Sequence, residues 1–287
     1  MDISRVTIYK LVSEALSDEV YEKIKDNSMG SIRLGLSMDR TFYISTLGID
    51  EDNYEGTFDN PFRTFKYAIE FIRFRVLRNN WKVSLQFLDE YSDDSLLDLH
   101  MIKDLEDLTI SSEFPVRLNS VVITNSKVTL ENIEIDASRL SPEYSALNGE
   151  NSEISLNNVN LRVTNSTLNC QAGIYTSNSR VNLLTGITIQ IDNEEKGDLG
   201  NKIILDNNSV FDCAEGSSIT INGSVNSFIT LNNHSQLTHA DYLKTTLNGD
   251  GKRFELLRGS VIDTNGMSTG WIDGTENGEM DSSSQYY

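Results

Sequence analysis

Short triplets in which two apolar residues flank a variable residue recur along the chain after residue 81. Successive triplets begin 25, 20, 26, 27, 22, 26 and 25 residues apart. Each triplet has the alternating polarity of a β-strand, and a period in the twenties with one such strand per unit predicts a β-solenoid. The triplets begin at Val83, Leu108, Val128, Ile154, Val181, Ile203, Ile229 and Phe254.

An asparagine follows most of these triplets at a fixed distance, at Asn132, Asn158, Asn207 and Asn233, and Thr185 takes the place once. Asparagine tolerates the left-handed backbone region, so we expect it to turn the chain sharply at a corner of the coil. Stacked asparagines can also hydrogen-bond from one coil to the next. A second strand follows the corner, as in 133–135 and 159–161. The order of strand, Asn corner, strand and loop predicts a parallel β-helix.

Two other repeat architectures fit the pattern less well. A β-propeller needs repeats of about 40 residues with four strands each. A leucine-rich repeat needs leucines at fixed positions and a helix or 3₁₀ turn in each unit, and the chain shows neither. The sequence therefore predicts an all-β fold, with the β-helix over residues 39–263.

The first 38 residues differ from the rest. Residues 3–24 place apolar side chains at helical spacing, and a linker with Gly30 and Gly35 follows over residues 26–39. We predict that residues 1–38 are an additional helical segment that attaches the chain to an assembly. The alternative, that this helix folds back on the main domain, stays open. Residues 1–27 show no signal peptide, and no stretch approaches the ~20 apolar residues of a membrane span, so we expect a soluble protein made in a cytoplasm.

The stretch "FYISTLGIDEDNYEGTFDNPFRTFKYAIEFI" reads as a strand over 41–45, a loop over 48–60 and a helix over 62–77. It resembles the N-terminal segment of right-handed parallel β-helix proteins of the pectate-lyase-like superfamily, among them phage tail spikes and fibres. The matching positions are Tyr43, Gly48, Asp50, Gly56, Thr57, Pro61, Phe62, Thr64, Ala68 and Ile69. The resemblance implies that residues 41–77 cap the first coil, with Phe65, Ile69 and Ile72 facing it.

The chain of 287 residues has a net charge of −19 and a pI of about 4.5. This acidity argues against nucleic acids and anionic membrane surfaces as partners. The two cysteines, Cys170 and Cys213, are too few for a disulfide framework, so we interpret both as buried apolar residues. Residues 264–287 are predicted to be an acidic polar tail that follows the last coil. We expect this tail to pack along the coil or against a neighbouring chain.

Metal ligation is a hypothesis for the loop of residues 50–59. Asp50, Asp52, Asn53 and Asp59 could hold calcium, but the full EF-hand spacing is missing, and turn formation explains the same residues. The three histidines, His100, His234 and His239, are interpreted as surface residues.

Catalysis on a sugar chain needs two carboxylates in reach of one bond. The leading pairs are Glu134 with Asp136 and Asp212 with Glu215, but pairs of this kind are expected by chance in so acidic a chain. Further acids stand at Asp192, Glu194, Glu195 and Asp206, and the aromatics Tyr144, Tyr175, Tyr242 and Trp271 share no register that would form a sugar platform. We therefore predict no catalytic, cofactor-binding or metal-binding residue.

The resemblance, the absence of a signal peptide and the absence of a convincing catalytic set together predict a non-enzymatic structural component of a tailed-phage virion, such as a fibre, spike or decoration protein. Its partners would be other virion proteins bound through the N-terminal helices, with a homotrimer and a bound host surface glycan as open alternatives. The alternative function is a polysaccharide depolymerase or lyase acting on host glycan. A third hypothesis is a bacterial adhesin-like module, but the absence of a visible export signal argues against it.

Overall fold

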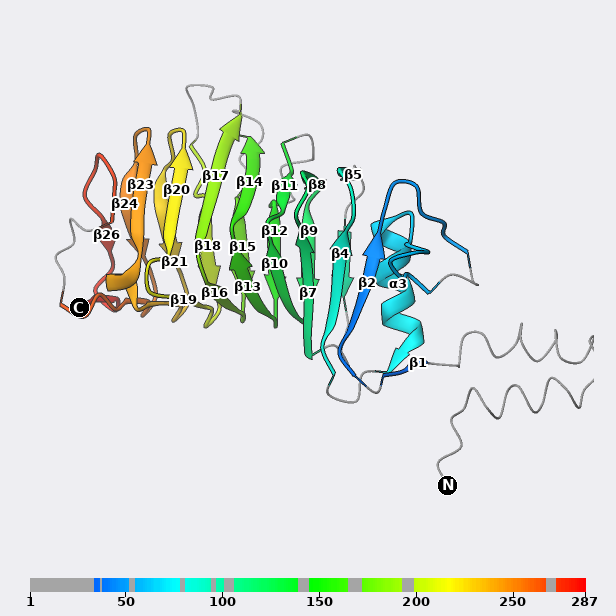
Figure 1. Cartoon of the computed structure of the whole chain (residues 1–287). Coiled ribbons are helices and arrows are strands. Elements are labelled where there is room, and N and C mark those ends of the chain that lie inside the picture. The colour runs from blue at the N-terminus through cyan, green and yellow to red at the C-terminus, as the bar shows by residue number, and fades with distance from the viewer. Residues whose placement is uncertain are drawn as a thin grey trace, which may run out of the picture.

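The computed structural model describes residues 34–36, 38–51, 55–77, 81–93, 97–100, 106–138, 145–164, 172–192, 199–266 and 272–287. About half of these residues lie in the strands of three parallel sheets that wind together into a β-solenoid (Figure 1). From β4 to β25 the chain passes through the three sheets in turn, and from β7 on each of these strands pairs in parallel with the strand one coil earlier. The predicted all-β parallel solenoid is confirmed.

We number the sheets in the order in which a coil visits them. Sheet 1 has ten strands: β2 (Arg40–Ile44), β4 (Val83–Phe87), β7 (Glu106–Ser112), β10 (Lys127–Glu131), β13 (Glu153–Asn157), β16 (Arg180–Leu183), β19 (Val210–Cys213), β22 (Gln236–Thr238), β25 (Val261–Ile262) and β27 (Gln285–Tyr286). Sheet 2 has seven: β5 (Tyr91–Asp93), β8 (Val116–Leu118), β11 (Glu134–Asp136), β14 (Val159–Thr164), β17 (Gly186–Asp192), β20 (Ser218–Asn222) and β23 (Lys244–Asn248). Sheet 3 has eight: β6 (Leu97–His100), β9 (Val121–Thr124), β12 (Leu147–Glu150), β15 (Ile174–Ser177), β18 (Ile203–Asp206), β21 (Ser227–Leu231), β24 (Lys252–Leu256) and β26 (Glu279–Met280).

The core is a set of apolar columns that run through the stack. In β13, Ile154 and Leu156 are fully buried while the residues between and beside them are partly exposed. Ile154 pairs in register with Val128 one coil earlier and with Val181 one coil later. Because side chains of a strand alternate between its two faces, this register stacks apolar residues inside and polar residues outside.

The predicted repeat is correct in kind, but its register is wrong in the second half of the chain. The triplets from Val83 to Val181 lie in sheet 1, whereas the triplets at Ile203, Ile229 and Phe254 lie in sheet 3. The sheet 1 partner of Val181 is Phe211. All three sheets bury alternate residues, so their strands carry the same polarity pattern, and the pattern alone cannot tell one face from another.

The chain therefore forms three strands per coil, instead of the predicted two strands and a loop. Asn132 and Asn158 lie at the corner between sheets 1 and 2, as predicted, and both have a positive φ. Asn207 and Asn233 also have a positive φ, but they lie at the corner between sheets 3 and 1. The predicted bonds between coils are present, since Asn158 donates to Asn132 (2.8 Å) and Asn233 donates to Asn207 (3.3 Å).

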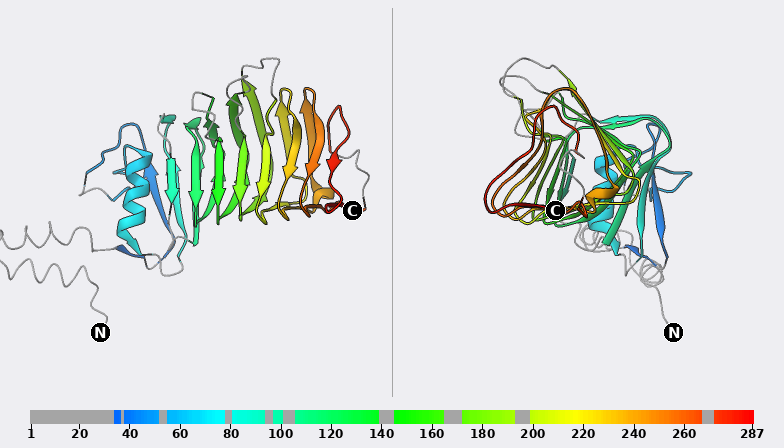
Figure 2. Two further views of the ribbon diagram at one scale, coloured as in Figure 1. Left: turned by 180° about the vertical axis from the view of Figure 1, so that it is seen from behind. Right: turned by 90° about the vertical axis from the view of Figure 1, so that its left-hand side faces the viewer.

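The predicted helix over 62–77 is α3 (Phe65–Arg75), which lies beside β2 at one end of the stack (Figures 1 and 2). Phe65, Ile69 and Ile72 are buried, and the Phe65 ring stacks on Phe87 of β4 with 5.8 Å between the ring centroids. The helix starts later than predicted because Phe62 bridges in parallel to Ile44 of β2. It ends earlier because β3 (Val76–Leu77) pairs with β1 (Leu34–Gly35). The helix predicted over residues 3–24 lies outside the described residues.

Asp50 holds the start of α3. Its carboxylate accepts hydrogen bonds from the backbone N–H groups of Arg63 (2.8 Å) and Thr64 (3.1 Å) and from the Thr64 hydroxyl (2.6 Å). Thr64 is the N-cap residue, and its Oγ1 accepts a bond from the N–H of Tyr67. Asp50 is one of the positions at which this chain resembles the pectate-lyase-like segment. In this structure its carboxylate binds the start of α3.

The prediction that the coils stop at Ile262 is wrong. Strand β26 pairs with β24 in sheet 3, and β27 pairs with β25 in sheet 1. Ile272 is buried, and the Tyr286 ring stacks on Phe254 with 5.3 Å between centroids. Gly278 is required here because a Cβ at this position would lie 2.3 Å from the Phe254 ring. The sequence showed little sign of this further coil, because residues 272–287 are mostly polar and pack through only a few apolar contacts.

Candidate functional site

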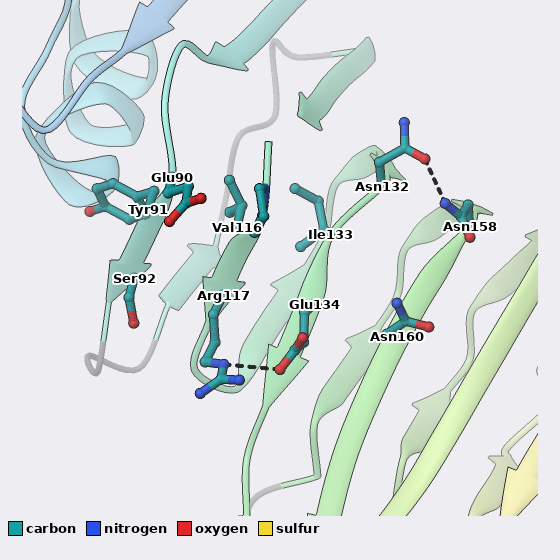
Figure 3. Close-up of a pocket in the computed structure, with 11 residues that line it drawn as sticks. Glu90, Tyr91, Ser92, Val116, Arg117, Asn132, Ile133, Glu134, Asn158 and Asn160 are labelled. Atoms are coloured by element: carbon teal, nitrogen blue, oxygen red, sulfur yellow. Dashed lines mark hydrogen bonds and ion pairs between the residues drawn. The ribbon is translucent and has the colours of Figure 1, made fainter. Parts of the chain in front are cut away.

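An open cavity of about 600 Å³ lies on the outer face of sheet 2 near the α3 end of the stack. Figure 3 shows that its walls come from β5, β8, β11 and β14 and from the corner that precedes β11 and β14. It is lined by Glu90, Tyr91, Ser92, Pro115, Val116, Arg117, Asn132, Ile133, Glu134, Asn158 and Asn160. It contains one member of the first predicted acidic pair, Glu134.

Arg117 joins both members of that pair. Its Nε lies 2.9 Å from Oε1 of Glu134, and its Nη1 lies 3.7 Å from Oδ2 of Asp136 (Figure 3 shows the first contact). The sheet register produces this arrangement, because Glu134 of β11 stands directly beside Arg117 of β8. The structure therefore brings Glu134 and Asp136 together around one guanidinium group.

Arg162 extends the network to the next two coils. Its guanidinium lies 4.0 Å from Glu134 and 2.9 Å from Asp192 of β17. Partial burial lowers the pKa of Arg162, but the hydrogen bond and charge of Asp192 and the charges of Asp136 and Glu134 raise it above its ordinary value. Asp136 is largely buried and also accepts bonds from the N–H (3.1 Å) and hydroxyl (2.6 Å) of Ser138.

The cavity also contains an aromatic residue that the sequence-based search missed. The hydroxyl of Tyr91 donates to Asp93 (3.0 Å) and accepts from the N–H of Phe65 (2.9 Å), so it ties the first strand of sheet 2 to the start of α3. Burial raises the pKa of Tyr91 well above its ordinary value; the bond from the N–H of Phe65 lowers it, and the carboxylates of Asp93 and Asp50 raise it further. Tyr91 therefore stays a neutral phenol and serves as a structural link.

A second cluster surrounds Asp212 on the outer face of sheet 1. Its carboxylate is bound by Arg180 of the previous coil (2.5 Å), by His239 after the next sheet 1 strand (2.7 Å) and by the Thr238 hydroxyl (2.9 Å). Partial burial raises the pKa of Asp212, but the bonds from His239, Arg180 and Thr238 outweigh this and hold it below the ordinary value. The hydrogen bond to Asp212, and then its charge, raise the pKa of His239.

The other predicted positions are placed apart from these clusters. Glu215 lies exposed in the turn after β19, while both oxygens of Asp212 are bound by Arg180 and His239. His234 has a positive φ of 63° at the corner between sheets 3 and 1. Cys213 is buried, as predicted, and burial raises the pKa of its thiol far above the ordinary value. Cys170, Tyr144, Trp271, Glu194 and Glu195 lie outside the described residues.

The calcium hypothesis for residues 50–59 is not tested, because Asp52 and Asn53 lie outside the described residues. Within the described ranges, no three His, Cys, Asp or Glu side chains are grouped closely enough to hold a metal ion. The carboxylate of Asp50 is bound at the start of α3, and Asp59 is exposed.

Sequence reasoning missed a ladder of buried serines at the corner between sheets 3 and 1. The backbone N–H of one serine donates to the hydroxyl of the serine one coil later, for example Ser152 to Ser179 (3.1 Å) and Ser179 to Ser209 (3.2 Å). The bonds run from Ser126 through Ser152, Ser179 and Ser209 to Ser235, and again from Ser260 to Ser284, and all seven serines are buried. The signal of the ladder is visible in the sequence, because six of these serines follow Asn, His or Gly and precede a variable residue and an apolar residue.

In comparisons with models of protein families, with curated proteins and with solved structures, nothing matches this chain. The pectate-lyase-like resemblance therefore rests on the residues of the N-terminal segment. In the part of the chain that the structure describes, no helix has both the length and the apolar composition needed to cross a bilayer.

Proposed function

We propose that the chain is a non-enzymatic structural component of a tailed-phage virion, in which the solenoid acts as a stiff spacer or surface element. One observation supports the non-enzymatic part: the acids best placed for catalysis are bound to cations from neighbouring coils. Glu134 and Asp136 share Arg117, and Asp212 is held by Arg180 and His239. A glycosidase needs one carboxyl group free to give up a proton and another free to attack or activate water.

The same ion pairs have a structural use. Arg117, Glu134, Arg162 and Asp192 belong to four successive strands of sheet 2, so each contact ties one coil to the next. A parallel solenoid whose coils are joined by backbone ladders, serine bonds and ion pairs resists bending. This stiffness suits a protein that must hold a fixed length on a particle.

The virion part of the proposal is supported by the N-terminal resemblance and by the sequence of residues 1–38. It predicts that purified particles contain the chain, as measured by mass spectrometry of gradient-purified phage. It also predicts that a chain lacking residues 1–38 folds into a soluble solenoid that no longer joins the particle. Particles free of the chain would contradict the proposal, and an insoluble truncated chain would contradict the attachment role of residues 1–38.

The second candidate function is a polysaccharide depolymerase or lyase, and the cavity on sheet 2 favours it, because a carboxylate and an arginine line an open groove there. The test is turnover of host capsule or lipopolysaccharide, measured as reducing ends and unsaturated sugars. We expect no product from the wild-type chain. Turnover that disappears in Glu134→Gln and persists in Glu215→Gln, the exposed control, would replace the structural proposal with the enzymatic one.

A further inference from the structure

Five asparagines in the chain are followed directly by glycine. Such pairs can react without an enzyme: the glycine backbone nitrogen attacks the asparagine Cγ, a new C–N bond closes a succinimide ring, and ammonia leaves. Water then opens the ring to give either aspartate or isoaspartate, in which the backbone runs through the side-chain carbon. The pairs are Asn148–Gly149, Asn222–Gly223, Asn248–Gly249, Asn265–Gly266 and Asn277–Gly278.

Attack requires that the asparagine side chain and the glycine N–H can both leave their positions. Two of the pairs, Asn222–Gly223 and Asn248–Gly249, are stacked on each other at the ends of β20 and β23. Asn248 donates through its side chain to the Asn222 side chain (2.8 Å), and the N–H of Gly223 donates to the Asn248 carbonyl (3.1 Å). A Cβ on Gly249 would lie 2.5 Å from the Gly223 backbone, so the two turns are in direct contact.

Two further pairs are also held by hydrogen bonds. Asn148 lies within β12 and donates through its side chain to the carbonyl of Ser145 (2.9 Å). The side-chain oxygen of Asn277 accepts a bond from Arg253 (3.1 Å), and Gly278 packs against the Phe254 ring. A held amide reacts only in the small fraction of molecules in which the local structure has opened.

Asn265–Gly266 differs from the other four pairs. Both residues are exposed in a turn after β25, with φ of 54° and 86°. A Cβ on Gly266 would meet no heavy atom within 4 Å. Among the residues that the structure describes, none forms a hydrogen bond with the Asn265 side chain or with the N–H of Gly266. Exposed loop tips of small and polar residues are also the preferred sites of proteolytic nicking, because their backbone leaves its native conformation most easily.

We propose that Asn265–Gly266 is a site of spontaneous deamidation and isomerisation, and that it is the first such site to react in the folded chain. The reaction places a new carboxylate near Asp263. In its isoaspartate product it also lengthens the backbone one residue after Thr264, whose N–H and hydroxyl both bind the carbonyl of Tyr287. The modified residue therefore adjoins the contact that joins β25 to the last strand. The proposal is independent of the proposed function.

The experiment compares the five sites within one molecule. The full chain is incubated in mildly alkaline buffer near body temperature, digested and mapped by mass spectrometry over several weeks. We expect Asn265 to convert roughly tenfold faster than Asn222 and Asn248, because those two need local opening first. The same incubation in concentrated urea should bring the rates of the five sites close together, since all then share an unfolded backbone.

Two variants control for the chemistry. Asn265→Gln should stop conversion at this position, because the longer side chain forms its ring much more slowly. Asn248→Ala should release Asn222 from its side-chain partner and raise the rate at Asn222 while leaving that at Asn265 unchanged. The proposal is overturned if Asn222 or Asn248 converts as fast as Asn265 in the folded chain. It is also overturned if folding slows Asn265 as much as it slows Asn222.

Discussion

Two corners of the coil are built in opposite ways. The corner between sheets 3 and 1 closes with two residues between β12 and β13 and with at most five, between β6 and β7. The corner between sheets 2 and 3 varies more, from two residues between Leu118 and Val121 to ten between Asp192 and Ile203. The first is built from left-handed residues and buried serines, and the second accepts loops of different lengths.

This difference indicates where the register of the stack is set. At the corner between sheets 3 and 1, Asn125, Asn151 and Asn178 all have φ near 50°, and each is followed by a serine of the ladder. A buried N–H must find an acceptor, so each coil can occupy only the height at which its serine meets the next one. At the corner between sheets 2 and 3 no equivalent ladder runs through the described residues, and a longer loop leaves the strands in place.

The largest expected difference between the two corners is the loss of stability that an insertion causes. Six Gly and Ser residues placed between Asn178 and Ser179 should destabilise the chain by about 3 kcal/mol or more, because several buried hydrogen bonds of Ser179 are lost at ~1–3 kcal/mol each. The same insertion between Glu195 and Lys196, in the corner between sheets 2 and 3, should cost about 1 kcal/mol, since longer loops add little entropy. Urea unfolding of both variants measures the effect, and equal losses would contradict the assignment of register to one corner.

A single serine tests the ladder without changing its length. Ser209 is fully buried, accepts a bond from the N–H of Ser179 (3.2 Å) and donates to the carbonyl of Asp206 (2.6 Å). Ser209→Ala should lower the free energy of unfolding by ~1–3 kcal/mol, because the Ser179 N–H is left buried without an acceptor. The matched control is Ser84→Ala on the partly exposed face of β4, where a change within about 0.5 kcal/mol is expected.

Two substitutions at Asn178 separate the contribution of its left-handed backbone from that of its side-chain hydrogen bond. This residue has φ 49°, and its side chain donates to Asn151 (2.6 Å). Asn178→Ala should cost about 1 kcal/mol, because alanine is strained in the left-handed region and cannot replace the bond. Asn178→Gly removes only the bond, so thermal and urea unfolding should show a smaller loss. If the glycine variant is no more stable than the alanine variant, left-handed strain does not explain the loss at this position.

The smallest expected effect on stability concerns His239, which lies at the third corner, between sheets 1 and 2. The bond to Asp212 raises the pKa of His239, so the folded state favours protonated histidine. The resulting stability is complete below the unfolded pKa of about 6.5 and is lost as the pH rises through the higher folded value. His239 is largely exposed, and solvent screening keeps the effect within about 0.5 kcal/mol. Urea midpoints across this pH range should fall slightly in the wild type and stay level in His239→Asn.

The sequence was sufficient for the parts of the structure that depend on neighbouring residues. Alternating polarity predicted the strands, asparagine predicted left-handed corners, and helical spacing placed Phe65, Ile69 and Ile72 on one buried face. It could also have revealed the serine ladder, because the order of a turn residue, serine, any residue and an apolar residue recurs from Asn125 to Ile262. That pattern marks the corner between sheets 3 and 1 even where the hydrophobic triplets change from one sheet to another.

The partners of the candidate acids could not be predicted from the sequence, because they lie on neighbouring coils. Glu134 and Asp136 were visible as a pair of acids, but Arg117 lies 17 residues from Glu134 along the chain and beside it in the sheet. The sequence suggested Glu215, three residues away, as the partner of Asp212 in a catalytic pair. In the structure Asp212 instead forms ion pairs with Arg180 and His239, which lie on adjacent coils. The lengths of the intervening loops decide which residues meet, and these lengths vary from coil to coil.

By itself, therefore, the sequence determined that this protein is a parallel β-solenoid, because alternating burial and left-handed corners are properties of short segments. Only the tertiary structure decided which triplet belongs to which sheet, that the coils continue beyond Ile262, and that arginines neutralise the candidate catalytic acids. The physical reason is that every face of the coil satisfies the same polarity pattern. The choice among faces is made by hydrogen bonds and ion pairs between residues about one coil apart, and these form only after the chain has wound.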